Sequence, residues 1–345
     1  MEFIEYENKN QAGPSPKYFR SHAHAPQASG AKSSRSLNPK FKDIRIFSLP
    51  NFLPFKMSSE PTFQLFTSLR YDPLLLQSLQ NTQSWPLSSP SPCPFYILPY
   101  HRDRLLHAAI RFNWSNAISA ISGPSGFQNL LDTLTKAIDT NSVAPLRVRI
   151  VLNHEGKLSV ESAPVPSVPL SNLFPGRLPP PESASVEKPK ISPLTGGALE
   201  LGNSDFLPSD PIKASPPWSI IPDPERTDPS PYTSFKTTSR EMYTSARERA
   251  QIPTFSSPKE ALLISSRNEE IMEGTLTTPF FYRDGKWVTP SENSGGQIGT
   301  TRRWGLKNGI CEQATIPLSS LIENEECWVS NGVRGFTWGK IQLSP

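Results

Sequence analysis

The chain has 345 residues, of which 38 are proline, and only 36% of its residues are hydrophobic. This composition leaves part of the length outside any folded core, yet the remainder, about 220 residues, is enough for a sizeable one. The 35 basic and 31 acidic residues nearly balance, so we expect no nucleic-acid partner, and no apolar run of about 18 residues predicts a membrane-spanning helix.

The three cysteines are scattered and form no Cys-X-X-Cys pair, which indicates a reducing compartment, and we expect a cytoplasmic protein. Residues 1–57 show no sustained hydrophobic period and are predicted to be a disordered N-terminal extension. Glutamates at positions 2, 5 and 7 argue against a targeting peptide at this end. Met57 could be the native start, or the preceding residues could be an ordinary tail.

Residues 58–165 are predicted to form a small α/β domain. Apolar residues recur with helical spacing in two stretches, and alternating patterns indicate strands. The expected strands are 63–71, a short apolar one at 95–99, 146–152 and 158–163, and the expected helices are 101–112 and 127–138.

Residues 166–231 have a different composition. Proline occupies 17 of the positions 164–231, which excludes an interior helix or a central strand over most of this length. We interpret the segment as an enlarged connection between two domains.

Residues 232–345 are predicted to form the second domain. A helix is expected over 240–250, followed by strands within 261–274, an aromatic strand at 280–282 and a further strand from Trp287. A helix from Thr301 roughly to residue 314 and strands at 326–332 and 336–341 complete the expected elements.

Two features of this second domain suit a ligand that is anionic at one end. Glu273 lies at the end of a predicted strand, and the loop 295–302, rich in glycine and threonine, leads into a helix. Backbone N–H groups and the dipole at a helix N-terminus attract anions. A glycine-rich loop alone is weak evidence, since many such loops are only turns.

Five motifs in a fixed order resemble the fold-type IV pyridoxal-phosphate enzymes. The motifs are His-X-X-Arg-Leu at 101–105, a lysine at 236, Glu-Gly-Thr at 273–275, Gly-X-Thr-Arg at 299–302 and Ser-Asn-Gly at 330–332. This family includes branched-chain and D-amino acid aminotransferases and 4-amino-4-deoxychorismate lyases. The stretches FTSLRYDP (66–73) and PYHRDRLLHAA (99–109) look most like the fungal aminodeoxychorismate lyase group.

The resemblance implies two α/β domains with pyridoxal 5'-phosphate (PLP) bound between them. Lys236 would attach the cofactor covalently, and its alternative reading is a solvated surface lysine. Glu273 would hold the protonated pyridine nitrogen. Glu269 and Glu270 are competing acids, but they lie in the turn before this strand and lack the following Gly-Thr.

The remaining site residues implied by the resemblance would bind the cofactor phosphate. Thr300 and Thr301 would use backbone N–H and hydroxyl groups, and Arg104 would supply a guanidinium group. Asn331 and Gly332 match the loop that closes over the phosphate, although a simple hairpin turn is equally consistent with the sequence. The family often has an asparagine where this chain has Thr278.

The function implied by the resemblance is elimination of pyruvate from 4-amino-4-deoxychorismate to give 4-aminobenzoate. The alternatives are a class IV aminotransferase of the branched-chain or D-amino acid type and a non-catalytic PLP-fold binding protein. We further expect a small-molecule substrate, a homodimer and no membrane partner. The five histidines are not at metal-ligand spacing from cysteines or acids, so no metal is expected.

Overall fold

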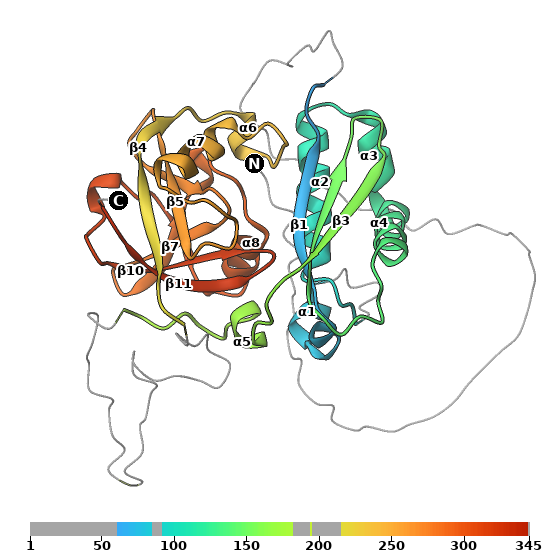
Figure 1. Ribbon diagram of the computed structural model, residues 1–345, viewed down its shortest axis with the longest axis horizontal. Helices are drawn as coiled ribbons and strands as arrows, with labels where there is room; N and C mark the ends of the chain where they lie inside the picture. Colours follow the sequence, from blue (N-terminus) through green and yellow to red (C-terminus); the bar gives the residue numbers. More distant parts are fainter. Residues whose placement is uncertain (1–60, 85–91, 182–193, 195–214, 344–345) are drawn as a thin grey trace, which may run out of the picture. The chain divides into compact units, whose positions relative to one another are not determined.

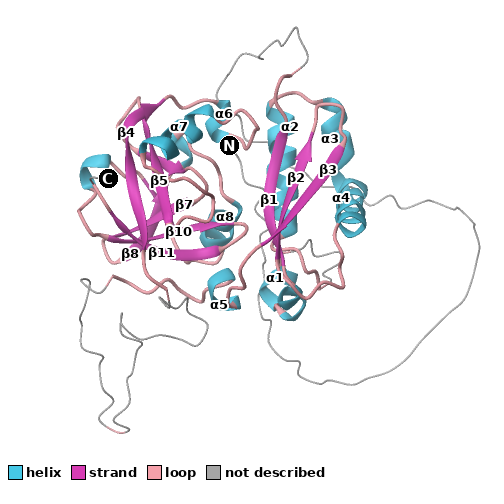
Figure 2. Cartoon of the chain, in the orientation of Figure 1, coloured by secondary structure: helices cyan, strands magenta, loops and turns pink. Residues whose placement is uncertain are grey.

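The computed structural model of the protein describes residues 61–84, 92–181, 194 and 215–343 (Figure 1). The predicted N-terminal extension and much of the proline-rich segment lie outside these residues. In the part that is described, the fold is the mixed α/β type that the sequence predicts, with two β-sheets and helices beside them (Figure 2). None of its helices has the length and apolar character needed to cross a membrane.

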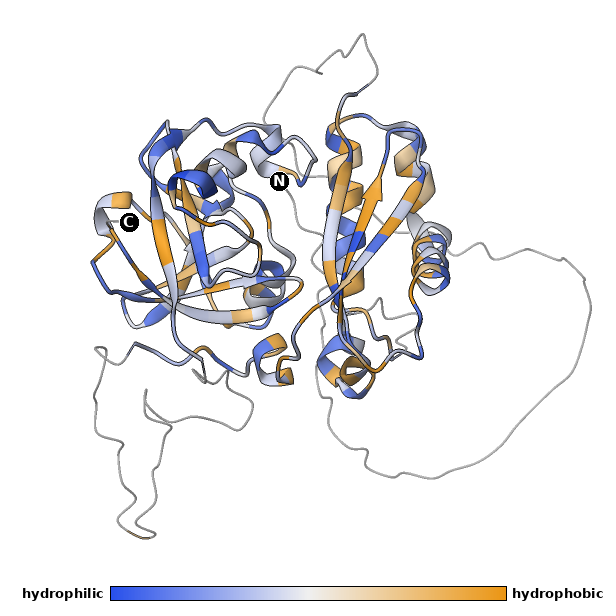
Figure 3. Ribbon diagram, in the orientation of Figure 1, coloured by the Kyte–Doolittle hydropathy of each residue, from blue (hydrophilic) through white to orange (hydrophobic). Residues whose placement is uncertain are grey.

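The smaller sheet is antiparallel and has the strand order β1-β2-β3. Its strands agree with the predicted ones and are β1 (Leu65–Tyr71), β2 (Leu146–Leu152) and β3 (Leu158–Pro164). Side chains alternate between the two faces of a strand. On one face, Leu65 and Leu69 of β1 are fully buried, and Figure 3 shows apolar residues on α2 and on the neighbouring strands.

Five helical segments follow β1 in the chain. They are η1 (Pro73–Gln77), α1 (Leu79–Gln83), α2 (Leu98–Arg111), α3 (Ser115–Ile121) and α4 (Gly123–Ala137). The predicted short strand at 95–99 is wrong, because Phe95 makes only a single bridge to Tyr71 and Leu98 already begins α2. Pro99 fits there because the first turn of a helix needs no backbone N–H.

The larger sheet has eight strands in the order β6-β5-β4-β11-β10-β7-β8-β9 and includes both parallel and antiparallel pairs. Buried aromatic residues, including Phe280, Trp328 and Phe336, form part of its core. The strands are β4 (Trp218–Thr227), β5 (Lys259–Ser265), β6 (Ile271–Gly274), β7 (Thr278–Arg283), β8 (Lys286–Pro290), β9 (Glu312–Ala314), β10 (Glu326–Asn331) and β11 (Gly335–Ile341).

Strand β4 corrects the interpretation of the proline-rich segment, because it is a central strand of the larger sheet. It pairs with β11 only over Trp218–Ile220, and its pairing with β5 shifts register between Pro222 and Arg226. Proline is tolerated at such bulges and where pairing to one neighbour has stopped. The prolines exclude a central strand over most of the segment, but β4 lies where local geometry permits one, so these residues are not part of a connection.

The helix expected up to residue 314 is shorter in the structure. Helix α8 (Thr300–Lys307) ends before Gly309, which has a φ of +68° that favours glycine. The chain then enters β9, which pairs in parallel with β8. The predicted helix to residue 314 therefore ran past this glycine and included β9.

The edge of β1 that does not pair with β2 connects the smaller sheet to the larger one. Phe66 N donates to Lys236 O (3.0 Å), Thr238 N donates to Gln64 O (2.9 Å) and Arg70 N donates to Gly332 O (2.9 Å). An edge strand has unpaired backbone groups that can bind a further segment. These bonds place residues from two distant parts of the chain beside β1.

The buried Glu260 carboxylate fixes the turn that follows β6. It accepts hydrogen bonds from Ala261 N (3.0 Å), from Thr275 N (3.0 Å) and Oγ1 (2.5 Å), from Leu276 N (3.1 Å) and from Thr277 Oγ1 (2.8 Å). Five donors satisfy a charged group that would otherwise be costly to bury.

We predict that Glu260→Gln lowers the free energy of unfolding by about 3 kcal/mol, because the amide N–H₂ would face backbone and hydroxyl donors. Urea unfolding followed by circular dichroism measures the change. The matched control is Glu312→Gln, which removes an exposed ion pair with Lys286. An equal shift of the two midpoints would contradict the assigned role.

Candidate active site

Lys236 follows the short helix α6 (Pro231–Ser234) and is half-buried. Its Nζ lies 5.0 Å from the centre of the Phe66 ring and, among the described residues, has no hydrogen-bond acceptor or ion pair. Burial lowers the pKa of this amine well below its usual value, and the charges of Arg240 and Arg104 lower it further. An amine with a lowered pKa is a better nucleophile and base at neutral pH.

Glu273 lies at the end of β6 and is 5% exposed. The phenol of Tyr243, on α7 (Glu241–Arg249), donates a hydrogen bond of 2.6 Å to Glu273 Oε1. Burial raises the pKa of Glu273 to about 7, although Tyr243, Lys236 and Arg240 act in the opposite direction. This carboxyl group can therefore gain or lose a proton near neutral pH.

A chain of hydrogen bonds connects β1, α2 and α8. Arg104 Nη2 donates to Thr67 Oγ1, which lies 2.7 Å from His101 Nδ1, and His101 Nε2 lies 3.3 Å from Thr300 Oγ1. Burial first, and then the charge of Arg104, lowers the pKa of His101, so its ring is neutral.

The donors and acceptors of this chain fix its direction. Arg104 can only donate, and its Nη2 also lies 3.4 Å from His101 Nδ1, so Nδ1 accepts and the Thr67 hydroxyl, which accepts from Arg104, donates to it. The neutral ring then carries its proton on Nε2, which donates to Thr300. This assignment leaves the Thr300 hydroxyl proton free to bind an anion.

The other predicted phosphate-binding residues lie close to this chain of hydrogen bonds, but some of them already make hydrogen bonds within the protein. Thr301 Oγ1 lies 2.7 Å from Ser330 Oγ in a fully buried position. Asn331 Oδ1 accepts from the N–H groups of Val333 (3.0 Å) and Arg334 (2.9 Å), so it shapes the β10–β11 turn. A Cβ at Gly332 would come within 2.5 Å of His101 Cε1, so this backbone approaches the ring closely.

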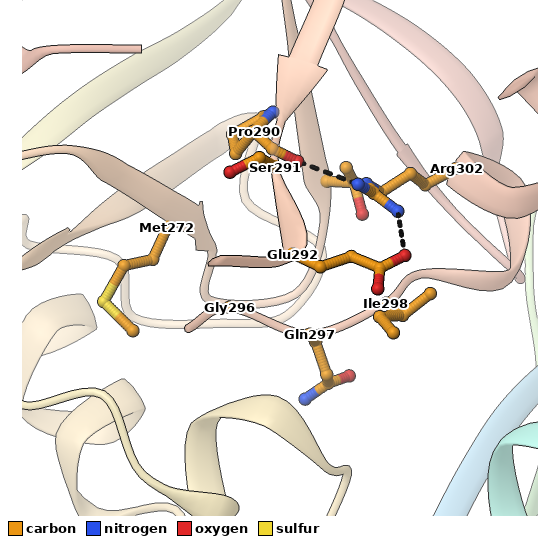
Figure 4. Close-up of a pocket in the computed structure, with 9 residues that line it drawn as sticks. Met272, Pro290, Ser291, Glu292, Gly296, Gln297, Ile298 and Arg302 are labelled. Atoms are coloured by element: carbon orange, nitrogen blue, oxygen red, sulfur yellow. Dashed lines mark hydrogen bonds and ion pairs between the residues drawn. The ribbon is translucent and has the colours of Figure 1, made fainter. Parts of the chain in front are cut away.

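Arg302, the arginine of the Gly-X-Thr-Arg motif, anchors the glycine-rich loop to neighbouring segments. Figure 4 shows its side chain directed toward Glu292 and the backbone of Pro290. It donates to Pro290 O (3.0 Å) and Gln313 Oε1 (2.8 Å), and Nη1 lies 3.8 Å from Glu292 Oε1. Arg302 therefore positions the loop.

The arrangement fits PLP. An amine can condense with the cofactor aldehyde, a buried carboxyl group can meet the ring nitrogen, and a guanidinium group can meet the phosphate. Arg104 Nε is buried and, within the described part of the chain, lacks a hydrogen-bond partner, so it has bonding capacity for a phosphate oxygen. Burial lowers the pKa of Arg104 to about 10, which leaves it charged at neutral pH.

The structure adds two residues that the sequence patterns did not single out for the site. The sequence predicted a helix over 240–250, but it could not show that the Tyr243 phenol reaches Glu273. The charge of Arg240 lowers the pKa of both Glu273 and Lys236. Its guanidinium carbon lies 3.9 Å from the centre of the Tyr243 ring. Its sequence position, four residues after Lys236, gave no signal of this contact.

Two fungal proteins are similar to this chain in sequence. The chain is 28% identical over 210 residues to aminodeoxychorismate lyase of Saccharomyces cerevisiae, covering 57% of this chain and 51% of that protein. It is also 28% identical over 134 residues to a putative aminodeoxychorismate lyase of Schizosaccharomyces pombe, covering 37% of this chain and 57% of that one. The chain thus spans about half the length of the curated relatives it matches.

The fold is also similar to a solved structure. A putative amino-acid aminotransferase from Mesorhizobium loti matches with a TM-score of 0.53 and 20% identity, covering 81% of this chain and 100% of that chain. The model of the amino-transferase class IV family matches residues 91–338. This match covers most of the chain, and the protein therefore belongs to the amino-transferase class IV family, whose members depend on PLP.

Proposed function

We propose that the protein is a PLP-dependent lyase that converts 4-amino-4-deoxychorismate into 4-aminobenzoate and pyruvate. The observation that supports a PLP enzyme most directly is the convergence of Lys236, Glu273 and Arg104, which come from three separate parts of the chain. Support for the lyase comes from the two fungal relatives that bear this name. The subunits would form a homodimer in the cytoplasm, which stays a prediction.

The residues of the chain would divide the work as follows. The bound cofactor supplies an electron sink for the carbon that bears the substrate nitrogen. Lys236 Nζ, neutral because its pKa is lowered, removes the proton from that carbon. Glu273 holds the ring nitrogen, and Arg104 with the Thr300 hydroxyl holds the phosphate. The proton on Nζ is then available to the departing pyruvate, so the substrate divides in two without addition of water.

An aminotransferase on the same scaffold is the second candidate, because the family model that matches the chain bears that name. It requires a second half-reaction with a keto acid. Incubation with an amino acid and 2-oxoglutarate would yield glutamate from an aminotransferase, whereas the proposed lyase gives 4-aminobenzoate and pyruvate from aminodeoxychorismate alone.

Removal of the lysine tests the attachment of the cofactor. We expect the purified wild-type protein loaded with PLP to have a visible absorbance band that borohydride abolishes, leaving Lys236 covalently tagged in a peptide digest. Lys236→Ala should lack both the band and measurable turnover, while Lys307→Ala, on the exposed end of α8, should keep both. Full turnover by Lys236→Ala would refute the proposed role.

Replacement of Glu273 tests the predicted contact with the ring nitrogen. Glu273→Gln should lower the turnover rate at least about 100-fold, because a neutral amide stabilises a protonated ring less well. Glu269→Gln, which alters a competing acid in an exposed ion pair with Arg226, should leave turnover nearly unchanged. Loss of activity in the Glu269 variant alone would reverse the assignment.

The Glu273→Gln variant also tests the titration of Glu273 in the cofactor-free protein. Its pKa of about 7 lies above the ordinary value of 4.5, so between these values the folded state binds more protons than the unfolded state. Its contribution to stability therefore falls as the pH rises from 4.5 to 7, by up to about 3 kcal/mol. Unfolding free energies measured across this range should show a smaller fall for Glu273→Gln than for the wild type.

A further inference from the structure

One face of the smaller sheet carries polar and charged residues. Thr67 contacts His101 on α2, so the neighbouring residues Phe66 and Ser68 point to the opposite face. The strand register places Arg149 of β2 opposite Ser68 and Arg147 opposite Arg70, on this same face. Two arginines of β2 therefore lie on the face that also presents Phe66.

Two guanidinium groups and the Lys236 amine lie around the Phe66 ring, which is 7% exposed. The Arg149 guanidinium carbon lies 4.8 Å from its centre, Lys236 Nζ lies 5.0 Å away, and the Arg240 guanidinium carbon lies 5.7 Å away. Each distance is in the range of a cation–π contact. The amine that would attach the cofactor thus shares one aromatic ring with a guanidinium group from β2 and one from the start of α7.

Neither guanidinium group is fully occupied by the protein. Arg240 Nη2 donates to Thr275 O (2.7 Å), but Nη1 is buried without a hydrogen-bond partner in the described part of the chain. Arg149 uses Nη1 for the exposed Glu161 at 2.9 Å. Burial of an unpaired donor on a charged group is costly, so an anionic ligand at Arg240 Nη1 would offset a real penalty.

Two of the acids nearby are occupied by other donors. Glu260 is committed to five donors of the turn after β6, and Glu273 accepts from Tyr243. Arg149 pairs with the exposed Glu161, whereas the Arg240 guanidinium has no carboxylate partner among the described residues. Arg240 therefore offers the positive charge that an anion would meet.

We propose that Arg149 and Arg240, which both contact the Phe66 ring, form a carboxylate-binding subsite. This subsite selects amines that carry two carboxylate groups. This assignment rests on the proposed function, because it takes Lys236 as the reacting amine. Guanidinium groups bind carboxylates through directed, charge-assisted hydrogen bonds. A substrate with a single carboxylate would leave one of these groups unpaired, which gives the discrimination a physical basis.

The test uses PLP-loaded full-length protein and two ligands that cannot react with the cofactor, isophthalate with two carboxylates and benzoate with one. Calorimetric titration should show that isophthalate binds at least about tenfold more tightly than benzoate, as expected for one added charged hydrogen-bonding pair. Arg149→Gln and Arg240→Gln should each weaken isophthalate about 10- to 100-fold and benzoate less.

Two matched variants separate binding from a structural effect. Arg149→Lys keeps the charge but loses the planar fork, and it should recover part of the isophthalate affinity. Arg226→Gln, which removes an exposed ion pair with Glu269, should bind both ligands as the wild type does. Urea midpoints of all variants show whether the Gln substitutions act through folding.

The outcomes distinguish this subsite from the proposed function. Equal affinity for the two ligands, or unchanged isophthalate binding in both Gln variants, overturns the subsite whatever reaction the enzyme performs. Selective isophthalate binding that depends on both arginines, in a protein that transaminates but does not release 4-aminobenzoate, supports the subsite and overturns the lyase. The same titration on cofactor-free protein gives the result if PLP does not bind.

Discussion

The edge of β1 that does not pair with β2 is the constraint on which the rest of the site depends. Its backbone groups at Phe66 and Arg70 bond to Lys236 O and Gly332 O, which belong to two segments almost 100 residues apart. An exposed edge must be paired or covered, so these contacts satisfy the backbone and also align the two segments beside α2. Arg104 and His101 then meet Lys236 and Thr300 because α2 packs on the same small sheet.

Two pairs of charged residues in the described part of the chain differ in how the protein satisfies them. Glu260 and Arg70 are satisfied by the chain itself, the latter through Asp72 (2.8 Å), Pro166 O (3.0 Å) and Val333 O (3.4 Å). Arg104 and Arg240, in contrast, each keep one buried N–H without a partner among the described residues. The first group fixes loops and strands, and the second retains bonding capacity at the site, where a phosphate or a carboxylate can use it.

The residues of the site fall into those that suit the cofactor and those that would meet the substrate. Glu273, Thr300 and Arg104 suit the cofactor, which all members of the family share, so they do not separate a lyase from an aminotransferase. The side that includes Phe66 and Arg149 would meet the substrate. On this proposal, substrate choice would depend on Arg149 of β2 and Arg240 at the start of α7.

The sequence by itself determined the fold class, most strands and the order of the motifs, because hydrophobic periodicity and short motifs are local properties. It singled out Lys236, Glu273 and Arg104 through the family resemblance. It misplaced the short strand at 95–99, assigned the residues of β4 to a connection between domains and lengthened α8, because bulges and helix stops depend on a few backbone angles. Only the tertiary structure decided that Tyr243 meets Glu273 and that Arg149 and Arg240 share the Phe66 ring, since such contacts depend on how distant strands are paired.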